Sequence, residues 1–196
     1  MKGNFNAALA FVMEHECVFA PGHFGEFDHV ICENVTGDRG GLTKFGIDQR
    51  SHPNIDIKHL DYHGAARLYR DIEWTKCRCD ELPSDVDVAV FDTAVNCGCG
   101  TAARLLQEGC NQAGADPSLS VDGFIGPKTI AASFKHPDAV YRLLTLRELH
   151  YQDLADDNPR LQKFMAGWMN RLSDLQIAVN GFHLMTKPEA ANQLPV

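Results

Sequence analysis

The spacing of apolar residues predicts a chain made mostly of helices. Helical periodicity, cap residues and prolines at helix starts predict helices over seven segments, of which 84–96 is apolar nearly all round. These segments cover residues 5–19, 57–74, 84–96, 100–113, 127–134, 137–155 and 159–183. Glycine, proline and aspartate dominate residues 20–56, where a short hairpin fits near 41–48. The pattern therefore predicts a mostly α fold with a small β-hairpin after the first helix.

The first helix carries one carboxylate on its apolar face. At 100° per residue, Glu16 lies about 20° from Leu9 and about 40° from Val12 around the helix axis. Glu14 lies about 140° from Leu9 and is expected to face water. Burial and the carbonyl end of the helix both disfavour the charged form, so we expect a raised pKa for Glu16. A glycosidase needs such an acid, although a glutamate that merely ends a helix gives the same pattern.

A glycine-rich loop between Asn34 and Ile47 offers further polar groups. Asp38 and Thr43 present a carboxylate and a hydroxyl from a tight turn. Gly40 and Gly41 allow positive φ and a close approach of the backbone to a ligand, so they are candidates for substrate binding. Taken alone, the run D-x-G-G is typical of any turn.

Together, His15-Glu16 and the run D-x-G-G-x-T-x-x-G-I resemble glycoside hydrolase family 108, the bacterial and phage N-acetylmuramidases. The family's usual pattern is H-E-G-G-Y, followed after a few residues by D-P-G-G-x-T-x-x-G-I. The resemblance implies a lysozyme-like fold in which Glu16 is the catalytic glutamate. It also implies that Asp38 and Thr43 face the scissile bond.

Two departures from the family pattern reshape the region after Glu16. Cys17-Val18 stands where the family has Gly-Gly, and an insertion within residues 18–33 precedes the Asp-Gly-Gly loop. The insertion carries three phenylalanines, and exposing such rings forfeits about 1.5–3 kcal/mol each. We therefore expect it to pack beside the first helix as one wall of the substrate cleft. A place on a far surface or in self-association is the alternative. Cys17 and Cys32 are candidates for a disulfide in an oxidising compartment.

The second half of the chain resembles the region that accompanies this family and is described as a predicted peptidoglycan-binding domain. The resemblance rests mainly on residues 90–98, 102–107 and 121–130. Asp92 lies on an otherwise apolar helix, and Asn96 ends that helix. Both are candidates for substrate contacts, or for satisfying buried polar groups nearby. The D-G-x-x-G-P-x-T run is expected to be structural.

These regions give the expected organisation of the chain. Residues 1–75 form the lysozyme-like catalytic part, with the insertion at 18–33. Residues 76–183 form the helical peptidoglycan-binding part, packed as one compact unit with the first. Residues 184–196 are expected to be a frayed tail.

Charge and cysteine content narrow the function classes. The net charge of −8 and the pI near 5.5 argue against nucleic acid, and they also count mildly against a polyanionic wall polymer. Seven cysteines, an odd number, make a full disulfide framework an unfavourable interpretation. Their two C-x-C pairs lack the usual zinc spacing, so we expect no metal site and no cofactor.

The resulting hypothesis is a muramidase that cleaves the β-1,4 bond between N-acetylmuramic acid and N-acetylglucosamine in peptidoglycan. The first residues do not resemble a signal peptide, so we expect synthesis in the cytoplasm and action in the periplasm or cell wall. Export would use a holin, as for a phage endolysin, or a secretion apparatus. No apolar run is long enough to span a membrane. The alternatives are a module that binds peptidoglycan without cutting it, and a lytic transglycosylase.

Overall fold

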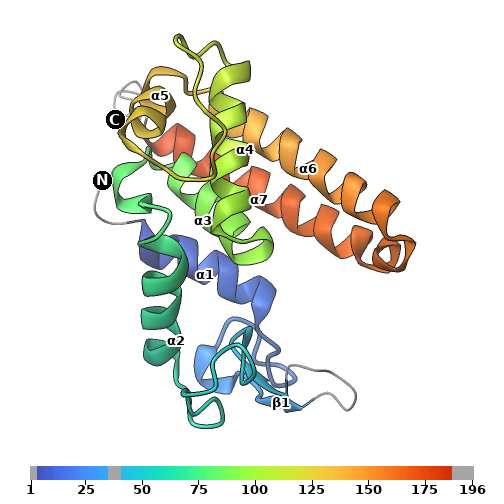
Figure 1. The fold of residues 1–196 in the computed structure, drawn as a ribbon. Helices are drawn as coiled ribbons and strands as arrows, with labels where there is room; N and C mark the ends of the chain where they lie inside the picture. The colour runs from blue at the N-terminus through green and yellow to red at the C-terminus, as the bar shows by residue number, and fades with distance from the viewer. Residues whose placement is uncertain (1–3, 35–40, 187–196) are drawn as a thin grey trace, which may run out of the picture. The chain divides into compact units, whose positions relative to one another are not determined.

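The structure is a computed structural model that describes residues 4–34 and 41–186 (Figure 1). Within those ranges it contains seven α-helices and one small antiparallel sheet. The helices are α1 (Phe5–Glu16), α2 (Tyr62–Tyr69), α3 (Val86–Cys97), α4 (Cys99–Gln112), α5 (Pro127–Lys135), α6 (Ala139–Asp157) and α7 (Met165–Thr186). The strands, in the order β1-β2-β3, are β1 (Glu33–Asn34), β2 (Leu42–Lys44) and β3 (Ile47–Asp48). The predicted mostly α, lysozyme-like class is confirmed.

Two helices are shorter than the periodicity predicted. Helix α1 ends at Glu16 and not at residue 19, because Phe19 pairs with Val30 in an antiparallel bridge. Helix α2 begins only at Tyr62, where the side chain of Asp61 accepts a hydrogen bond of 2.7 Å from the Gly64 backbone N–H. Such a cap satisfies one of the free N–H groups at a helix start, and it defines the boundary more sharply than apolar spacing does.

The chain divides into two compact units. Residues 6–72 form the N-terminal unit, which contains nearly all of α1, the sheet and α2. Residues from 73 onward, together with Asn4 and Phe5, form the C-terminal unit. Helix α7 continues to Thr186, three residues into the predicted tail, and residues 187–196 lie outside the described part.

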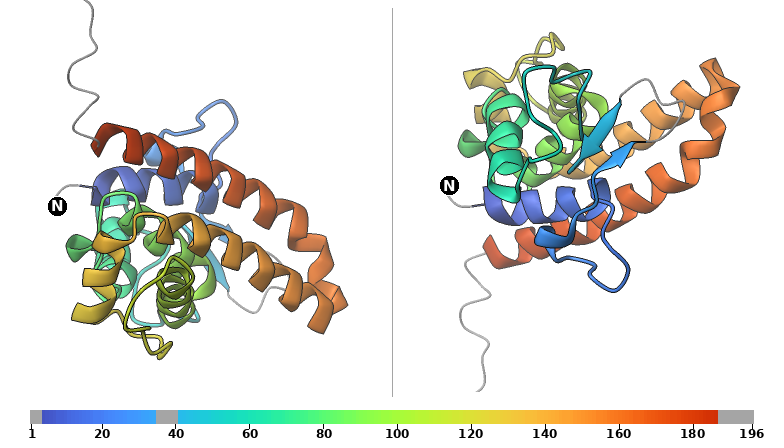
Figure 2. Two further views of the ribbon diagram at one scale, coloured as in Figure 1. Left: turned by 90° about the horizontal axis from the view of Figure 1, so that it is seen from above. Right: turned by 90° about the horizontal axis from the view of Figure 1, so that it is seen from below.

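The C-terminal unit is a helical bundle around α3. Every residue of α3 from Val86 to Ala94 is buried, as its all-round apolar sequence predicted. Helix α4 packs against both α3 and α6, and α6 and α7 run side by side in both views of Figure 2. Near the middle of α3 the ring of Phe91 lies close to those of Phe5 and Trp74, with centroids 5.2–6.0 Å apart, and Trp74 meets both other rings edge to face. None of the described helices is long and apolar enough to cross a membrane.

Asp92 is the polar centre of this bundle and not a substrate contact. Its carboxylate is fully buried and accepts hydrogen bonds from Arg147 of α6 at 2.6 Å and from Arg171 of α7 at 2.7 Å. Burial alone would raise the pKa of Asp92, but the charges of Arg147 and then Arg171 outweigh it and hold that pKa below its usual range. Both oxygens are thus taken by guanidinium groups, and the expectation that Asp92 binds substrate is corrected.

Asp92→Asn should destabilise the protein by about 3–5 kcal/mol, because it leaves two buried guanidinium groups without their counter-charge. Because the pKa of Asp92 is lowered in the folded protein, its charge stabilises the fold fully at pH values above about 3.9, the pKa of an unfolded aspartate. This stabilisation is lost as the pH falls through the pKa of Asp92 in the folded protein. Thermal unfolding at neutral and acid pH measures this. Glu81→Gln, which breaks the exposed pair with Arg78, is the control and should cost at most about 1 kcal/mol. Equal losses in the two variants would contradict a structural role for the buried group.

Candidate functional site

Glu16 is the last residue of α1 and is half-buried. Leu9 and Val12 on the same helix are fully buried, whereas Glu14 is exposed. The predicted apolar stripe and the outward position of Glu14 are therefore confirmed. Glu16 lies where this buried stripe reaches the helix end, and its intermediate burial leaves it accessible to solvent.

A tight hairpin turn joins β2 to β3. Lys44 pairs with Ile47, and the two residues between them, Phe45 and Gly46, have φ angles of 55° and 73°. Two successive positive φ angles are characteristic of a type I′ turn, which matches the twist of short antiparallel strands. The buried hydroxyl of Tyr69, on α2, donates a 2.8 Å hydrogen bond to the Phe45 carbonyl. This bond ties the hairpin tip to the second helix.

The same turn lies directly against Glu16. A Cβ atom at Gly46 would be 2.9 Å from the Cβ of Glu16, 3.0 Å from its Oε2 and 2.8 Å from the Tyr69 hydroxyl oxygen. Real side chains do not approach so closely, so only glycine fits here. The end of α1, the hairpin tip and α2 therefore converge on the Glu16 carboxyl. Sequence reasoning missed Tyr69, because periodicity placed it on an apolar face without indicating a partner.

Thr43 lies in the middle of the three-stranded sheet. It is opposite Glu33 on β1 and opposite Asp48 on β3, so the three side chains share one face. Asp48 is occupied as a turn cap, since its Oδ1 accepts hydrogen bonds from the backbone N–H groups of Ser51 at 2.9 Å and Arg50 at 3.1 Å. The Ser51 bond is the main reason that the pKa of Asp48 is lowered.

The other predicted loop residues are only partly within the described structure. Asp38 and Gly40 lie outside the described residues, so their predicted roles stay predictions. Gly41 is described, with a φ of 78°, directly before β2. That conformation is the one for which glycine was expected at this position.

The insertion after Glu16 forms an ordered loop in which aromatic side chains pack against one another. Phe19 contacts Phe24 and Phe27 at centroid distances of 5.3 and 5.8 Å, and Phe27 stacks on Tyr62 of α2 at 4.9 Å. Two of the three phenylalanines are partly buried, as expected, but Phe24 is 73% exposed and corrects that part of the prediction. The ring contacts that hold the insertion are internal or reach α2. A role in a substrate cleft stays a prediction.

The ends of the insertion pair in an antiparallel register. Phe19 bridges Val30, and the Ile31 N–H donates to the Val18 carbonyl at 2.8 Å. Extending this register by one pair places Cys17 opposite Cys32, and both are free thiols in this structure. Burial, and then the charge of Glu16, raises the pKa of Cys17 to about 12, so this thiol is uncharged at neutral pH.

Asn96 belongs to a polar network of the C-terminal unit. Its Oδ1 accepts a 2.7 Å hydrogen bond from the hydroxyl of Tyr151, which in turn accepts from Arg147 Nε at 2.7 Å. The Tyr151 ring stacks on Trp168 at 4.9 Å. Asn96 is half-buried and lies one turn along α3 from Asp92, so this network continues the buried ion group towards the helix end.

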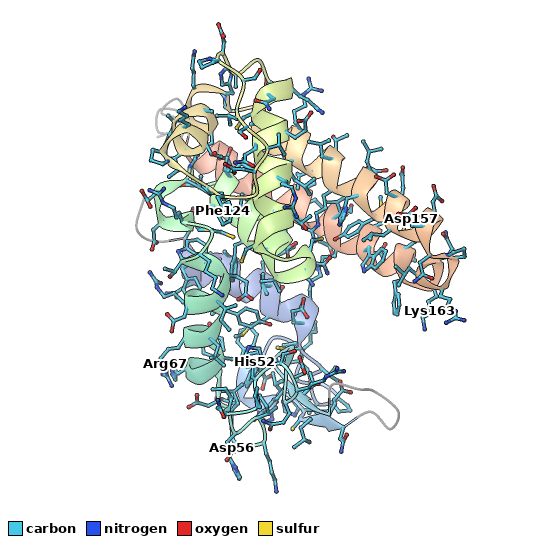
Figure 3. The ribbon with its side chains drawn as sticks, viewed as in Figure 1. His52, Asp56, Arg67, Phe124, Asp157 and Lys163 are labelled. Atoms are coloured by element: carbon cyan, nitrogen blue, oxygen red, sulfur yellow. The ribbon has the colours of Figure 1, made fainter. Side chains whose placement is uncertain are left out.

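A hollow of about 840 Å³ lies between the loop 115–124 and α5 of the C-terminal unit. Beneath it, the buried amide of Gln107 binds the loop 122–124, donating to Asp122 at 2.8 Å and accepting from the Gly123 N–H at 3.0 Å. This clamp confirms a structural role for the D-G-x-x-G-P-x-T run. Phe124, labelled in Figure 3 beside α4, is 77% exposed at the rim, and Lys128 and Lys135 also line the hollow.

Two family models match separate regions of the chain. Residues 29–98 match the family model described as glycosyl hydrolase 108, and residues 101–173 match the one described as a predicted peptidoglycan domain. A solved structure of SagA from Brucella abortus is 26% identical, with a TM-score of 0.71, over 93% of this chain and 97% of that one. A search of curated proteins finds no match. The first match begins at His29, so Glu16 lies outside it.

Gly46→Ala should abolish glycoside hydrolase activity, because a methyl group there must displace the Glu16 carboxyl or the Tyr69 hydroxyl. Gly114→Ala is the matched control: its φ is also positive, at 95°, but the added methyl would meet open space. Both variants should lose about 1–2 kcal/mol of stability to backbone strain, and only Gly46→Ala should lose turnover. Measured side by side, equal activities in the two variants would show that the turn does not position Glu16.

Proposed function

We propose that this chain is an N-acetylmuramidase. Its two family regions support a peptidoglycan hydrolase at the family level. The enzyme cleaves the β-1,4 bond between N-acetylmuramic acid and N-acetylglucosamine, with Glu16 as the general acid. The observation that carries the assignment is the convergence of three elements on one half-buried carboxyl, at the position where the sequence resembles the catalytic glutamate of family 108.

In this mechanism Glu16 protonates the leaving glycosidic oxygen. Such a residue must hold its proton until the bond breaks and must also reach the substrate. Glu16 follows a buried apolar stripe and remains partly exposed, so the substrate can reach its carboxyl. The hairpin tip and Tyr69 limit the rotamers that the Glu16 side chain can adopt, which fixes the direction in which its proton is delivered.

We assign the second role in the reaction to Asp38, with Thr43 close to it in sequence. Glycoside hydrolysis builds positive charge on the sugar ring, and a carboxylate stabilises that charge or activates the attacking water. Thr43 is partly exposed on a sheet face that it shares with Glu33, which supports a role for its hydroxyl beside such a carboxylate. Gly40 and Gly41 would let the backbone approach the glycan.

The hollow between the loop 115–124 and α5 is our candidate for holding the wall polymer. Exposed aromatic rings are typical of binding surfaces, and Phe124 lies at its rim. Lys128 and Lys135 supply local positive charge for carboxylates of the peptide stems, although the chain as a whole carries −8. We further propose that the enzyme acts in the periplasm or cell wall, and that a holin or a secretion apparatus gives it access.

Glu16→Gln should lower the release of reducing ends from purified sacculi by about 10²–10⁴, the usual worth of general acid catalysis. The change keeps the shape of the side chain, so the melting temperature should shift little. Sedimentation with sacculi should persist, because the proposed wall-binding hollow belongs to the other unit. Glu14→Gln, on the exposed side of the same helix, is the control and should match the wild type.

Two outcomes of that experiment would reject the proposal. Retention of more than about a tenth of the wild-type rate in Glu16→Gln would place the acid elsewhere. A wild-type protein that sediments with sacculi but releases no reducing ends would be a binding module, which is the alternative function.

Asp38→Asn and Thr43→Ala should each lower kcat more than they raise KM, because the proposed interactions form in the transition state. Steady-state kinetics on soluble glycan fragments would measure both parameters. If either change mainly raised KM, that residue would be a binding contact and the proposed chemical role would be wrong.

A further inference from the structure

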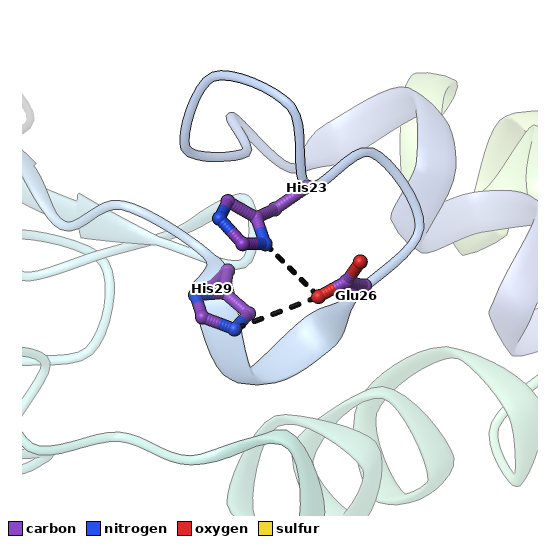
Figure 4. A group of neighbouring side chains, drawn as sticks. All are labelled: His23, Glu26 and His29. Atoms are coloured by element: carbon purple, nitrogen blue, oxygen red, sulfur yellow. Dashed lines mark hydrogen bonds and ion pairs between the residues drawn. The ribbon is translucent and has the colours of Figure 1, made fainter.

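Three side chains of the insertion that the proposed reaction does not use lie close together. His23 Nδ1 is 3.0 Å from Glu26 Oε2, and His29 Nε2 is 3.5 Å from the same oxygen (Figure 4). The two imidazole rings stack, with centroids 3.9 Å apart and planes 17° from parallel. Within the described ranges, His23, Glu26 and His29 form the group of histidine, cysteine or acidic side chains that lie close enough together to hold one metal ion.

The backbone, and not the side chains themselves, creates this arrangement. Three consecutive turns are closed by hydrogen bonds from His23 N to the Ala20 carbonyl, from Glu26 N to the His23 carbonyl and from His29 N to the Glu26 carbonyl, at 2.8–3.0 Å. Gly22 and Gly25, with φ angles of 83° and 82°, occupy the positions of the first two turns that need positive φ. A turn every three residues therefore brings positions 23, 26 and 29 to one side of the loop.

The rest of the insertion holds these turns in place. The Ala20 N–H donates to the His29 carbonyl at 2.9 Å, which closes the base of the loop next to the Phe19–Val30 bridge. Phe27, between Glu26 and His29, stacks on Tyr62 of α2. The three polar side chains are 41–57% exposed, so an ion can reach them from water without opening the loop.

We propose that His23, Glu26 and His29 bind a zinc ion, with water completing the coordination. Imidazole nitrogens and a carboxylate oxygen are ligands that zinc prefers, and bonds of about 2.0–2.2 Å place tetrahedral ligand atoms about 3.3–3.6 Å apart. Of the two distances to Glu26 Oε2, 3.5 Å lies within that range and 3.0 Å slightly below it, and all three ligand atoms lie within 4.8 Å of one another. A small movement of the two rings completes the site, so the ion would fasten successive turns of the insertion together.

This proposal replaces the expectation, drawn from the C-x-C spacing, that the chain has no metal site. The cysteines remain competing ligands, so the experiment must separate the two. Isothermal titration of zinc into the untagged full-length protein should show one bound equivalent. His23→Ala, Glu26→Gln and His29→Ala should each weaken binding by more than about tenfold, since each removes a direct ligand.

His59→Ala is the matched control. His59 makes a comparable exposed pair with Asp56, with a 2.9 Å contact, but that pair offers only two ligands. This variant should bind zinc as the wild type does. Circular dichroism verifies that each variant is folded, and the ring nitrogens of His23 and His29, but not of His59, should shift in NMR spectra on addition of zinc.

Either of two results would overturn the site. Zinc binding that survives unchanged in the His23→Ala/His29→Ala double variant would belong to the cysteines. No zinc binding by the folded wild type would mean that the three side chains form only a surface hydrogen-bonded group, whose stabilising contribution is expected to be small.

Discussion

The close approach of the hairpin turn to Glu16 is the constraint on which the catalytic account depends. Phe45 and Gly46 both adopt positive φ, which is costly for a bulky residue such as phenylalanine. Burial of the Phe45 side chain and the hydrogen bond from Tyr69 to its carbonyl compensate this cost. Because position 46 has no side chain, the turn can contact the carboxyl of Glu16 directly. The final glycine of the D-x-G-G-x-T-x-x-G-I run thus has a steric reason.

Asp92 and Glu16 are carboxylates in contrasting environments. Asp92 is fully enclosed and stays charged because two guanidinium groups balance it, which suits a residue that holds helices together. Glu16 ends its helix half-buried, next to the Tyr69 hydroxyl and the Phe45–Gly46 turn. Because a buried carboxyl paired with arginine is held in its charged form, Asp92 suits a structural role and not proton donation.

Patterns within short stretches of the sequence predicted the features that depend on local structure. Apolar spacing found every α-helix of the described ranges and placed Glu16 among buried positions and Glu14 outside them. These patterns failed where a partner comes from elsewhere in the chain. Asp92 finds Arg147 and Arg171 at 55 and 79 residues' separation, and Tyr69 finds Phe45 at 24, so no spacing pattern revealed these bonds.

The insertion carries a sequence signal that would have predicted the grouping of His23, Glu26 and His29. Glycines at 22 and 25 mark two turns, and turns repeated every three residues bring His23, Glu26 and His29 together. The sequence A-P-G-H-F-G-E-F-D-H and the preferences of turn residues are enough to predict this grouping. The cysteine spacing carries no such signal.

The identity of the cleaved bond is the most direct test of the central claim. Mass spectrometry of the fragments released from purified peptidoglycan distinguishes the possible reactions. Hydrolysis by a muramidase predicts fragments that end in a reducing N-acetylmuramic acid and carry one added water. Fragments that end in a 1,6-anhydro sugar would identify a lytic transglycosylase, and fragments with reducing N-acetylglucosamine would show that a different glycosidic bond is cut. Either result would contradict the account.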